Sequence, residues 1–343
     1  MSEQIPVLIV AGFLGSGKTT LLNHLLRDNR GTRIGVVVND FGAVNIDAML
    51  VAGQVDATVS LSNGCVCCAV DVNELDDLFE RLAQPKARID VIVVEASGLA
   101  EPRNLIRMVL ASDNPRLRYG GLVEVVDAEQ FPASRARHPE LGGHLRLADL
   151  VVLNKADRLP PADLKDLRAG LAAEIGQVPV CATSFGRVDP GLLFDPPTRA
   201  SSTVAEQLSF EDLLHDHDSG DEDHAHLHDE YTSVSFTSAE PLDPRRFVEF
   251  LEDPPCGLFR AKGVVAFDVA EERRRFVVHL VGRHIVFEPG PWGRGEQRVS
   301  SLVLIGAGMS EDKATARLGE TVHTGERPLE SAAMLGVWRY TPH

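Results

Sequence analysis

A glycine-rich segment near the start of the chain carries residue types that bind phosphate groups. Residues 12–19 read Gly-Phe-Leu-Gly-Ser-Gly-Lys-Thr and match the pattern G-x-x-x-x-G-K-[ST]. In this pattern the glycines let backbone N–H groups wrap an anion, the lysine reaches the β- and γ-phosphates, and the final hydroxyl binds Mg²⁺. A chance glycine-rich turn is the alternative, but the strand pattern before the motif and the helical pattern after it favour phosphate binding. The candidate residues are Gly12, Gly15, Ser16, Gly17, Lys18, Thr19 and Thr20.

A second segment, Asn154-Lys155-Ala156-Asp157, indicates which base the nucleotide carries. An aspartate at this place can accept both N1–H and the exocyclic N2–H of guanine, and adenine offers no such pair. Alone, the four-residue pattern could equally cap a helix. After a phosphate-binding loop and at the end of a later strand, it predicts guanine recognition by Asn154, Lys155 and Asp157.

A third segment, at residues 91–98, lies between these two and ends a buried apolar strand in Glu95. A carboxylate at the end of such a strand holds Mg²⁺ in phosphate-loop enzymes, often through water. We therefore expect Thr19 and Glu95 at the Mg²⁺, and Gly98 to offer its N–H to the γ-phosphate. A structural glutamate at a strand end is the alternative.

Three cysteines, Cys65, Cys67 and Cys68, follow an Asn-Gly turn between the first and third segments. Thiolates favour Zn²⁺, Cu(I) or a similar soft ion. Three sulfurs without a closed fourth ligand indicate an open or transfer site rather than a structural one. Three small buried residues and a redox pair are the other interpretations.

A tract of acidic and histidine residues occupies positions 211–230. It holds nine Asp or Glu residues, no Lys or Arg, and five of the twelve histidines of the chain. Neutral imidazoles bind transition metals and the flanking carboxylates attract cations. The tract therefore predicts an auxiliary metal-collecting segment, the alternative being a solvated acidic linker. The candidate ligands are His215, His217, His224, His226 and His228.

The overall charge and hydropathy exclude several classes of partner. The 343 residues carry a net charge of −16, which disfavours binding to nucleic acid or to an anionic membrane. No apolar run reaches the roughly 18 residues that span a bilayer. A cleaved leader would destroy the strand and loop near residue 5, so we expect a cytoplasmic protein with reduced thiols.

Apolar β-branched runs alternate with helical patterns up to about residue 195. This alternation predicts an α/β fold, a P-loop NTPase domain at 1–195 with a mostly parallel sheet and helices on both faces. The strands are expected at 5–10, 33–40, 90–97, 120–128, 149–157 and 178–184, and helices at 18–27 and 159–175.

The rest of the chain has a different rhythm. A Pro/Ser-rich and then His/Asp-rich stretch at 196–230 is typical of a linker. The pattern of residues 231–319 predicts a small α+β domain, and that of residues 320–343 predicts an irregular tail. In the small domain we expect strands at 231–237, 260–269, 275–288 and 301–308, and helices at 243–252 and 310–318.

Taken in order, the motifs resemble those of the CobW-type GTPases, relatives of the nickel-insertion GTPases. The resemblance covers residues 4–318 and rests on GFLGSGKTTLLNHLL, NDFGAVNIDAMLV, LSNGCVCC, VVEASGLAEP, VVLNKAD and RAKGVVAFD. It implies a Mg²⁺-dependent GTPase with a CobW-type C-terminal domain. The implied cargo is a transition metal, commonly Zn²⁺, with Co²⁺ in cobalamin-pathway members. The implied partners are a client metalloprotein or apo-enzyme and a second copy in a metal-dependent homodimer.

The resemblance also implies that Asp40 is a further metal or switch ligand. The family usually has Glu in an N-E-F-G segment, and here Asn39-Asp40-Phe41-Gly42 provides a carboxylate one methylene shorter. The cysteines lie between Asp40 and Glu95, two segments expected at the γ-phosphate. If GTP orders these segments it also orders the metal ligands, and hydrolysis releases them.

Two other functions are consistent with parts of the pattern. One is a cobalt-handling GTPase that supports cobalamin biosynthesis or loads B12-type enzymes. The other is a passive metal store with a vestigial nucleotide fold, and the complete set of nucleotide motifs argues against it. In the small domain, Arg260 and Lys262 could contact the first domain or a partner, or lie on a solvated strand edge. His279 and His284, among apolar strand residues, are expected to be packed.

Overall fold

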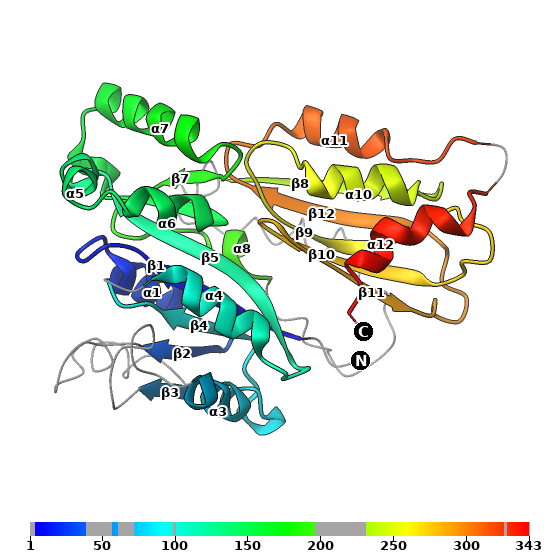
Figure 1. The fold of residues 1–343 in the computed structure, drawn as a ribbon, viewed down its shortest axis with the longest axis horizontal. Coiled ribbons are helices and arrows are strands. Elements are labelled where there is room, and N and C mark those ends of the chain that lie inside the picture. Colours follow the sequence, from blue (N-terminus) through cyan, green and yellow to red (C-terminus); the bar gives the residue numbers. More distant parts are fainter. Residues whose placement is uncertain are drawn as a thin grey trace.

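The computed structural model of the chain describes residues 4–38, 57–60, 72–98, 101–195, 231–325 and 328–342. These residues form two domains that lie side by side, each built on its own sheet (Figure 1). In this part of the chain no helix has the length and apolar character needed to cross a membrane.

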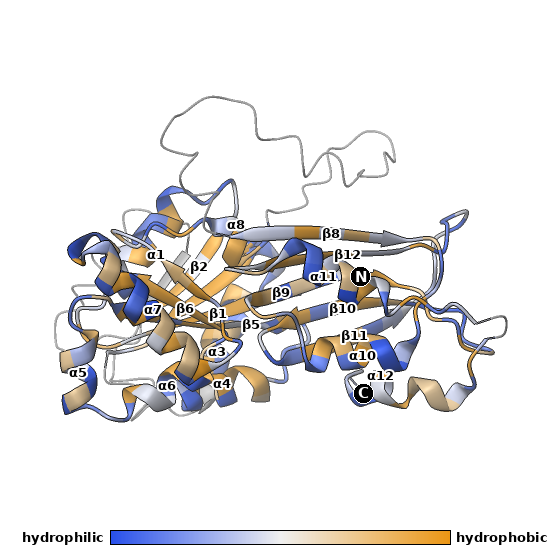
Figure 2. Ribbon diagram, turned by 90° about the horizontal axis from the view of Figure 1, so that it is seen from above, coloured by the Kyte–Doolittle hydropathy of each residue, from blue (hydrophilic) through white to orange (hydrophobic). Residues whose placement is uncertain are grey.

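The first domain is built on a seven-stranded sheet in the order β3-β2-β4-β1-β5-β6-β7, with every neighbouring pair parallel. The central strands are runs of β-branched residues because both of their faces are buried (Figure 2). This confirms the predicted α/β fold. The strands are β1 (Ile5–Ala11), β2 (Ile34–Val38), β3 (Ala57–Ser60), β4 (Val91–Glu95), β5 (Leu117–Asp127), β6 (Leu150–Asn154) and β7 (Val180–Ala182).

Helices cover both faces of this sheet, as expected. Helix α1 packs Leu21, Leu22 and Leu25 into one apolar cluster, while α3, α4 and α6 contribute to clusters on the opposite face. The helices are α1 (Lys18–Arg27), α3 (Val72–Leu82), α4 (Pro102–Ala111), α5 (Phe131–Arg137), α6 (Leu141–Leu147), α7 (Pro161–Ile175) and α8 (Pro190–Leu193), with short 3₁₀ turns η1 (Pro85–Ala87) and η2 (Ala156–Arg158).

The second domain is a five-stranded antiparallel sheet in the order β11-β10-β9-β12-β8. Helices α10 and α11 lie on one face, over a core that includes Phe247, Phe267, Phe276 and Phe287. The elements are β8 (Thr232–Ser238), α10 (Pro244–Glu252), β9 (Leu258–Val265), β10 (Arg275–Val281), β11 (His284–Gly290), β12 (Ser300–Gly306) and α11 (Glu311–Gly319).

Two expectations for this domain need correction. The single strand expected at 275–288 is a hairpin, because Gly282, at a φ of 56°, turns the chain between β10 and β11. The tail expected to be irregular contains η3 (Ser331–Met334) and α12 (Leu335–Arg339). It is ordered by packing, since Val337 is fully buried and Trp338 meets Phe276 edge to face. A helix of five residues is too short to show a period in sequence.

A buried arginine joins the two domains. Arg260 on β9 donates to the carbonyls of Gly191 and Leu192 at 2.7 and 3.1 Å, and to Asp195 Oδ1 at 2.6 Å. Burial would raise the pKa of Asp195, but the charges of Arg260 and Lys262 hold it well below its usual range. Of the roles left open for Arg260, the structure therefore shows a contact with the first domain.

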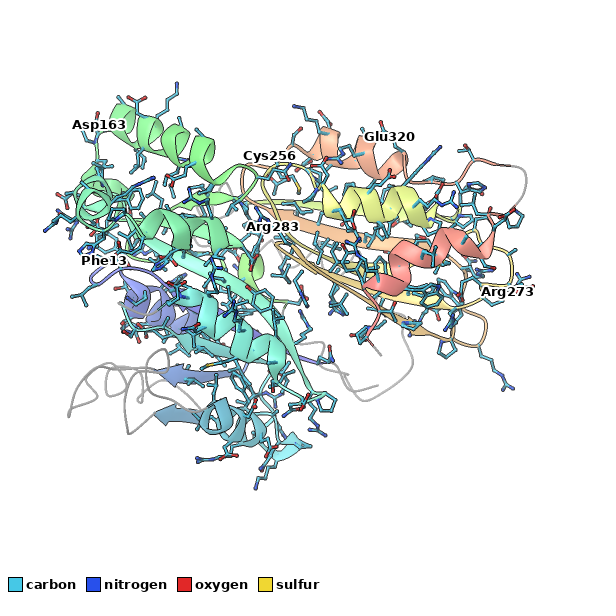
Figure 3. All side chains as sticks on the ribbon, viewed as in Figure 1. Phe13, Asp163, Cys256, Arg273, Arg283 and Glu320 are labelled. Carbon is cyan, nitrogen blue, oxygen red and sulfur yellow. The ribbon has the colours of Figure 1, made fainter. Side chains whose placement is uncertain are left out.

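The turn of the β10–β11 hairpin makes a second contact between the domains. Arg283, labelled in Figure 3, marks this turn at the junction. Gly282 lies against Asp149, which a Cβ at this glycine would approach within 1.7 Å. Asp149 accepts a hydrogen bond of 2.6 Å from Tyr119, whose ring meets His284 edge to face. Burial raises the pKa of Asp149 to about 6.

We expect Arg260→Leu to lower the free energy of unfolding by about 3 kcal/mol, since it leaves Asp195 and two carbonyls without their guanidinium. The matched control is Arg339→Leu, which removes a pair with Glu252 in which the arginine side chain is 65% exposed. This change should cost about 1 kcal/mol or less. Urea unfolding of the variants measures both, and equal costs would refute the structural role of Arg260.

Candidate functional site

The glycine-rich loop connects the end of β1 to the start of α1, and its conformation requires glycine at two positions. Gly12 and Gly17 have φ angles of 146° and 104°, which side chains rarely adopt. A Cβ at Gly12 would lie 2.3 Å from the Val125 carbonyl oxygen, and one at Gly17 would lie 2.2 Å from Asn154 Nδ2. The loop is therefore pressed against the ends of β5 and β6.

Lys18 lies over the loop that precedes it. Its ammonium group donates to the carbonyls of Gly12 at 2.9 Å and Phe13 at 3.3 Å, and only 8% of the residue is exposed. A cation is thus held at the centre of the loop, where an anion bound by the backbone N–H groups would meet it.

The two residues predicted to hold Mg²⁺ meet in the structure. Thr19 Oγ1 donates to Glu95 Oε1 over 2.9 Å, although 76 residues separate them. The sheet brings them together because β1 and β4 are neighbours and Val10 is in register with Glu95. A hydroxyl and a buried carboxylate are hard oxygen donors of the kind that Mg²⁺ prefers. The residues present therefore fit this ion.

Gly98, three residues after Glu95, lies against the phosphate-binding loop. A Cβ on Gly98 would come within 2.9 Å of the backbone nitrogen of Leu14, so only glycine allows this approach to the loop.

Asn154 ties the phosphate-binding loop to the loop after β7. Its Nδ2 donates to the Ser16 carbonyl and its Oδ1 accepts from the Gly186 N–H, both at 2.9 Å. The residue is 2% exposed, so both ends of the amide are used inside the protein. Asn154 is therefore a structural bridge between loops, and no atom of its side-chain amide is left over for direct contact with a base.

Lys155 adds a second bridge. At a φ of 60°, it directs its ammonium group to the Gly15 carbonyl at 2.8 Å and to Asp127 Oδ2 at 2.6 Å. Asp157 is exposed, and its backbone N–H donates to Ser184 Oγ over 3.2 Å. The exposed carboxylate of Asp157 is available to a ligand.

The other two predicted residues of the phosphate-binding loop, Ser16 and Thr20, differ in exposure. Ser16 is 1% exposed, and its hydroxyl has no hydrogen-bond partner among the described residues. Thr20 is exposed beside Gly186, whose Cβ would lie 3.1 Å from the Thr20 carbonyl carbon. The nucleotide-binding residues predicted from three distant segments thus converge on one edge of the sheet.

The sequence interpretation missed two acidic residues at this edge. Asp127 ends β5 in register with Asn154 and holds Lys155. The sequence signal that could have identified Asp127 is its position at the end of the strand that precedes the N-K-x-D strand. Glu124 lies three residues earlier, in register with Ala11, and an acidic residue inside a run of valines was the only sign of it.

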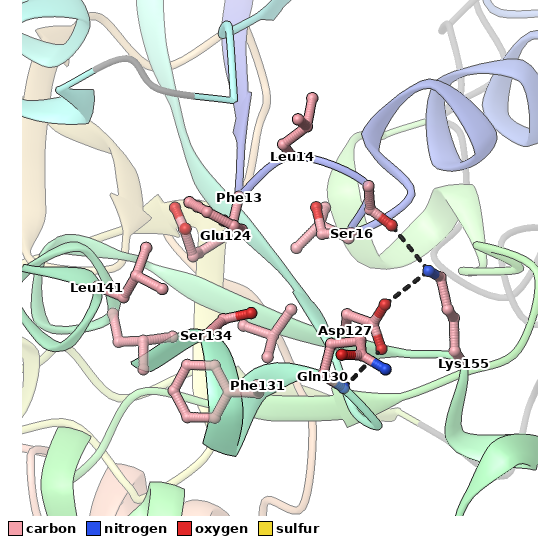
Figure 4. A pocket seen from close by; sticks show the side chains of 14 residues that line it. Phe13, Leu14, Ser16, Glu124, Asp127, Gln130, Phe131, Ser134, Leu141 and Lys155 are labelled. Carbon is pink, nitrogen blue, oxygen red and sulfur yellow. Dashed lines mark hydrogen bonds and ion pairs between the residues drawn. The ribbon is translucent and has the colours of Figure 1, made fainter. Parts of the chain in front are cut away.

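Glu124 lines a cavity of about 330 Å³ beside the phosphate-binding loop. The walls come from the loop, the end of β5, α5 and α6, and Figure 4 shows Glu124 and Lys155 on opposite sides. Phe13, at the tip of the loop, is far from the junction with the second domain (Figure 3). Burial raises the pKa of Glu124 to about 8, Glu101 adds to the rise and Lys18 opposes it.

The predicted metal ligands lie outside the described residues. These are Cys65, Cys67, Cys68 and Asp40, with the auxiliary histidines His215, His217, His224, His226 and His228. Within the ranges that the structure describes, no three His, Cys, Asp or Glu side chains gather in a way that could hold a metal ion. The cysteine and histidine hypotheses therefore remain predictions.

Comparisons with known proteins agree with both domains. Residues 6–180 match the family model "CobW/HypB/UreG, nucleotide-binding domain", and residues 231–322 match "Cobalamin synthesis protein cobW C-terminal domain". The chain is 30% identical to the zinc chaperone CobW of a Sinorhizobium species over 336 residues, covering 88% of this chain and 93% of that protein.

It is also 28% identical to the zinc chaperone YjiA of Escherichia coli K12, covering 91% of this chain and 97% of that protein. A crystal structure of the Zn(II)-bound YjiA GTPase aligns with a TM-score of 0.44 at 24% identity, over 94% of this chain and all of that one.

The buried carboxyl of Glu124 makes stability depend on pH. Its pKa is about 8 in the folded chain against 4.5 as the ordinary value, so the folded state binds the proton more tightly. The resulting stability is complete below about pH 4.5 and is lost as pH rises through 8. We therefore expect Glu124→Gln to gain stability over the native chain as pH rises, reaching about 5 kcal/mol at pH 9.

Urea unfolding at pH 5, 7 and 9 measures this difference. Glu249→Gln, on an exposed residue of α10 in the second domain, is the matched control and should show no comparable gain in stability. A difference between Glu124→Gln and the native chain that stays constant from pH 5 to 9 would contradict the burial of this carboxyl.

Proposed function

The chain belongs to the family of CobW, HypB and UreG nucleotide-binding domains, and we propose on this basis that it is a Mg²⁺-dependent GTPase that delivers zinc to a client metalloprotein. The observation that carries the nucleotide part is the meeting of Thr19 and Glu95 beside the phosphate-binding loop. The zinc part is supported by two relatives that are named zinc chaperones and align with about nine-tenths of the chain.

In this proposal, Lys18 and the backbone N–H groups of residues 12–19 hold the phosphates. Lys18 exchanges its two carbonyl acceptors for phosphate oxygens, at no cost in buried charge. Thr19 and Glu95 hold Mg²⁺, which neutralises charge on the β- and γ-phosphates when bound. The Gly98 N–H, brought close to Leu14, orients the terminal phosphate.

The guanine is read by the exposed carboxylate of Asp157. Asn154 and Lys155 position it, because both tie the segment to the carbonyls of the phosphate-binding loop. The base and the phosphates are therefore held by parts of the chain that are hydrogen-bonded to each other. Steady-state measurement of phosphate release from GTP, with ATP as the comparison, tests this function.

The zinc cargo is assigned to Cys65, Cys67 and Cys68, with Asp40 as a further ligand. Ser60, the last described residue before the cysteines in the sequence, is in register with Val38, and Val38 is in register with Glu95. Neighbouring strands are about 4.8 Å apart, so Ser60 lies roughly 10 Å from Glu95. This proximity supports coupling between nucleotide state and metal affinity.

We expect Asp157→Asn to exchange the preferred base from guanine to xanthine. The asparagine Oδ1 still accepts from N1–H of either base, but its Nδ2–H can donate only to the O2 oxygen of xanthine and meets another donor, N2–H, in guanine. GTP affinity should fall by more than a hundredfold and XTP affinity should rise. Fluorescent-nucleotide titration measures both, and Asp163→Asn on α7 is the control. Unchanged GTP affinity would refute guanine reading by this residue.

We expect Cys65→Ser, Cys67→Ser and Cys68→Ser together to remove the tightest zinc site, because thiolates bind this ion far better than hydroxyls. Deletion of 211–230 should lower zinc stoichiometry but leave the tightest site and GTP turnover intact. Cys181→Ser and Cys256→Ser serve as controls. Competition with a zinc chelator gives the affinities, and a triple variant that binds zinc as tightly as the native chain would contradict the assignment.

A further inference from the structure

The cavity beside the phosphate-binding loop is separate from the part of the site that reads the base. In the described part of the chain its lining includes Gly15, Ser16 and Lys155 but neither Asn154 nor Asp157. Lys155 forms the boundary, because its ammonium group is fixed by Gly15 and Asp127. A volume of about 330 Å³ lies at the lower end of the range for pockets that hold ligand groups.

The Glu124 carboxyl at the inner wall lacks the partners that buried carboxyls normally have. The residue is 3% exposed, and its Oε2 has no hydrogen-bond partner among the residues that the structure describes. Leaving a buried carboxyl unpaired is costly, and a proton or a cation relieves the cost. A cation bound in the cavity would take the place of that proton as the partner of the carboxyl, so the wall selects for positive charge.

The other walls of the cavity suit the stem of a long basic side chain. Phe13, Phe131, Leu141 and Leu145 are apolar, while Gln130 and Ser134 add polar atoms to the lining. The walls are held in place from outside, because His138 packs against the Phe13 ring at 4.9 Å and the Arg135 guanidinium covers Phe131. Arginine and lysine bury their methylene stems along such surfaces, and their charged end groups remain able to pair with a carboxylate.

We propose that this cavity receives a basic side chain, arginine or lysine, from the client protein, with the Glu124 carboxylate as its counter-ion. The identification of the client rests on the proposed GTPase function. The guanidinium or ammonium head then lies beside Glu124, in a cavity that residues 13–16 of the phosphate-binding loop also line. A cation there complements the charge that develops on the phosphates during hydrolysis, so client docking and GTP turnover are linked.

The test uses the full-length, nucleotide-free chain and two small probes, butylguanidinium and its uncharged analogue butylurea. We expect the native chain to bind butylguanidinium more than tenfold more tightly, because only this probe forms a charge-assisted pair. Glu124→Gln should abolish the preference and Glu101→Gln should keep it. Titration followed by ligand-observed NMR gives the affinities. Equal binding of both probes by the native chain, or a preference that survives in Glu124→Gln, overturns the proposal.

A second variant covers the case in which Glu124→Gln does not fold. Ser134→Leu fills the cavity from α5 and leaves Glu124 in place, and it should also lose the preference. GTP turnover is measured on the same preparations. A chain that turns over GTP but binds both probes equally refutes this inference alone, while probe selectivity without GTP turnover refutes the proposed GTPase function alone. Dimerisation that Glu124→Gln abolishes would assign the basic side chain to a second copy and overturn the client assignment.

Discussion

The nucleotide site depends on the register of a parallel sheet. Because all seven strands run the same way, β1, β4, β5 and β6 deliver their carboxyl ends to one edge. The pairing of Val10 with Glu95 and of Asp127 with Asn154 then fixes which side chains meet there. The hydrogen bonds of Asn154 join two of the loops that leave this edge. A shift of one residue in any of these strands would turn a ligand toward the core.

The same edge connects the nucleotide to the rest of the molecule. Helix α1 begins at Lys18 and ends at Arg27, and three residues later Arg30 pairs with Asp189 at 2.8 Å, just before α8. The carbonyls of α8 accept the hydrogen bonds of Arg260 from the second domain. The joint between the domains is thus connected to the phosphate-binding loop through α1, the Arg30–Asp189 pair and α8.

Much of this arrangement could be predicted from the sequence, because each motif falls at the end of a strand with a strong apolar pattern. The positions of Thr19 and Glu95 follow from that rule alone. The dual role of Asn154 does not, since a pattern of four letters carries no information about which loops it joins. Glu124 and α12 were missed for a related reason. Their environment comes from segments distant in sequence, and neither produces a local period.

We propose that the nucleotide bound at this edge controls the affinity of Cys65, Cys67 and Cys68 for zinc. The most direct measurement is the zinc affinity of the full-length chain without nucleotide, with GDP and with a non-hydrolysable GTP analogue. We expect the tightest zinc binding with the analogue, and zinc should tighten binding of the analogue by the same factor. Equal zinc affinities in all three states would contradict it.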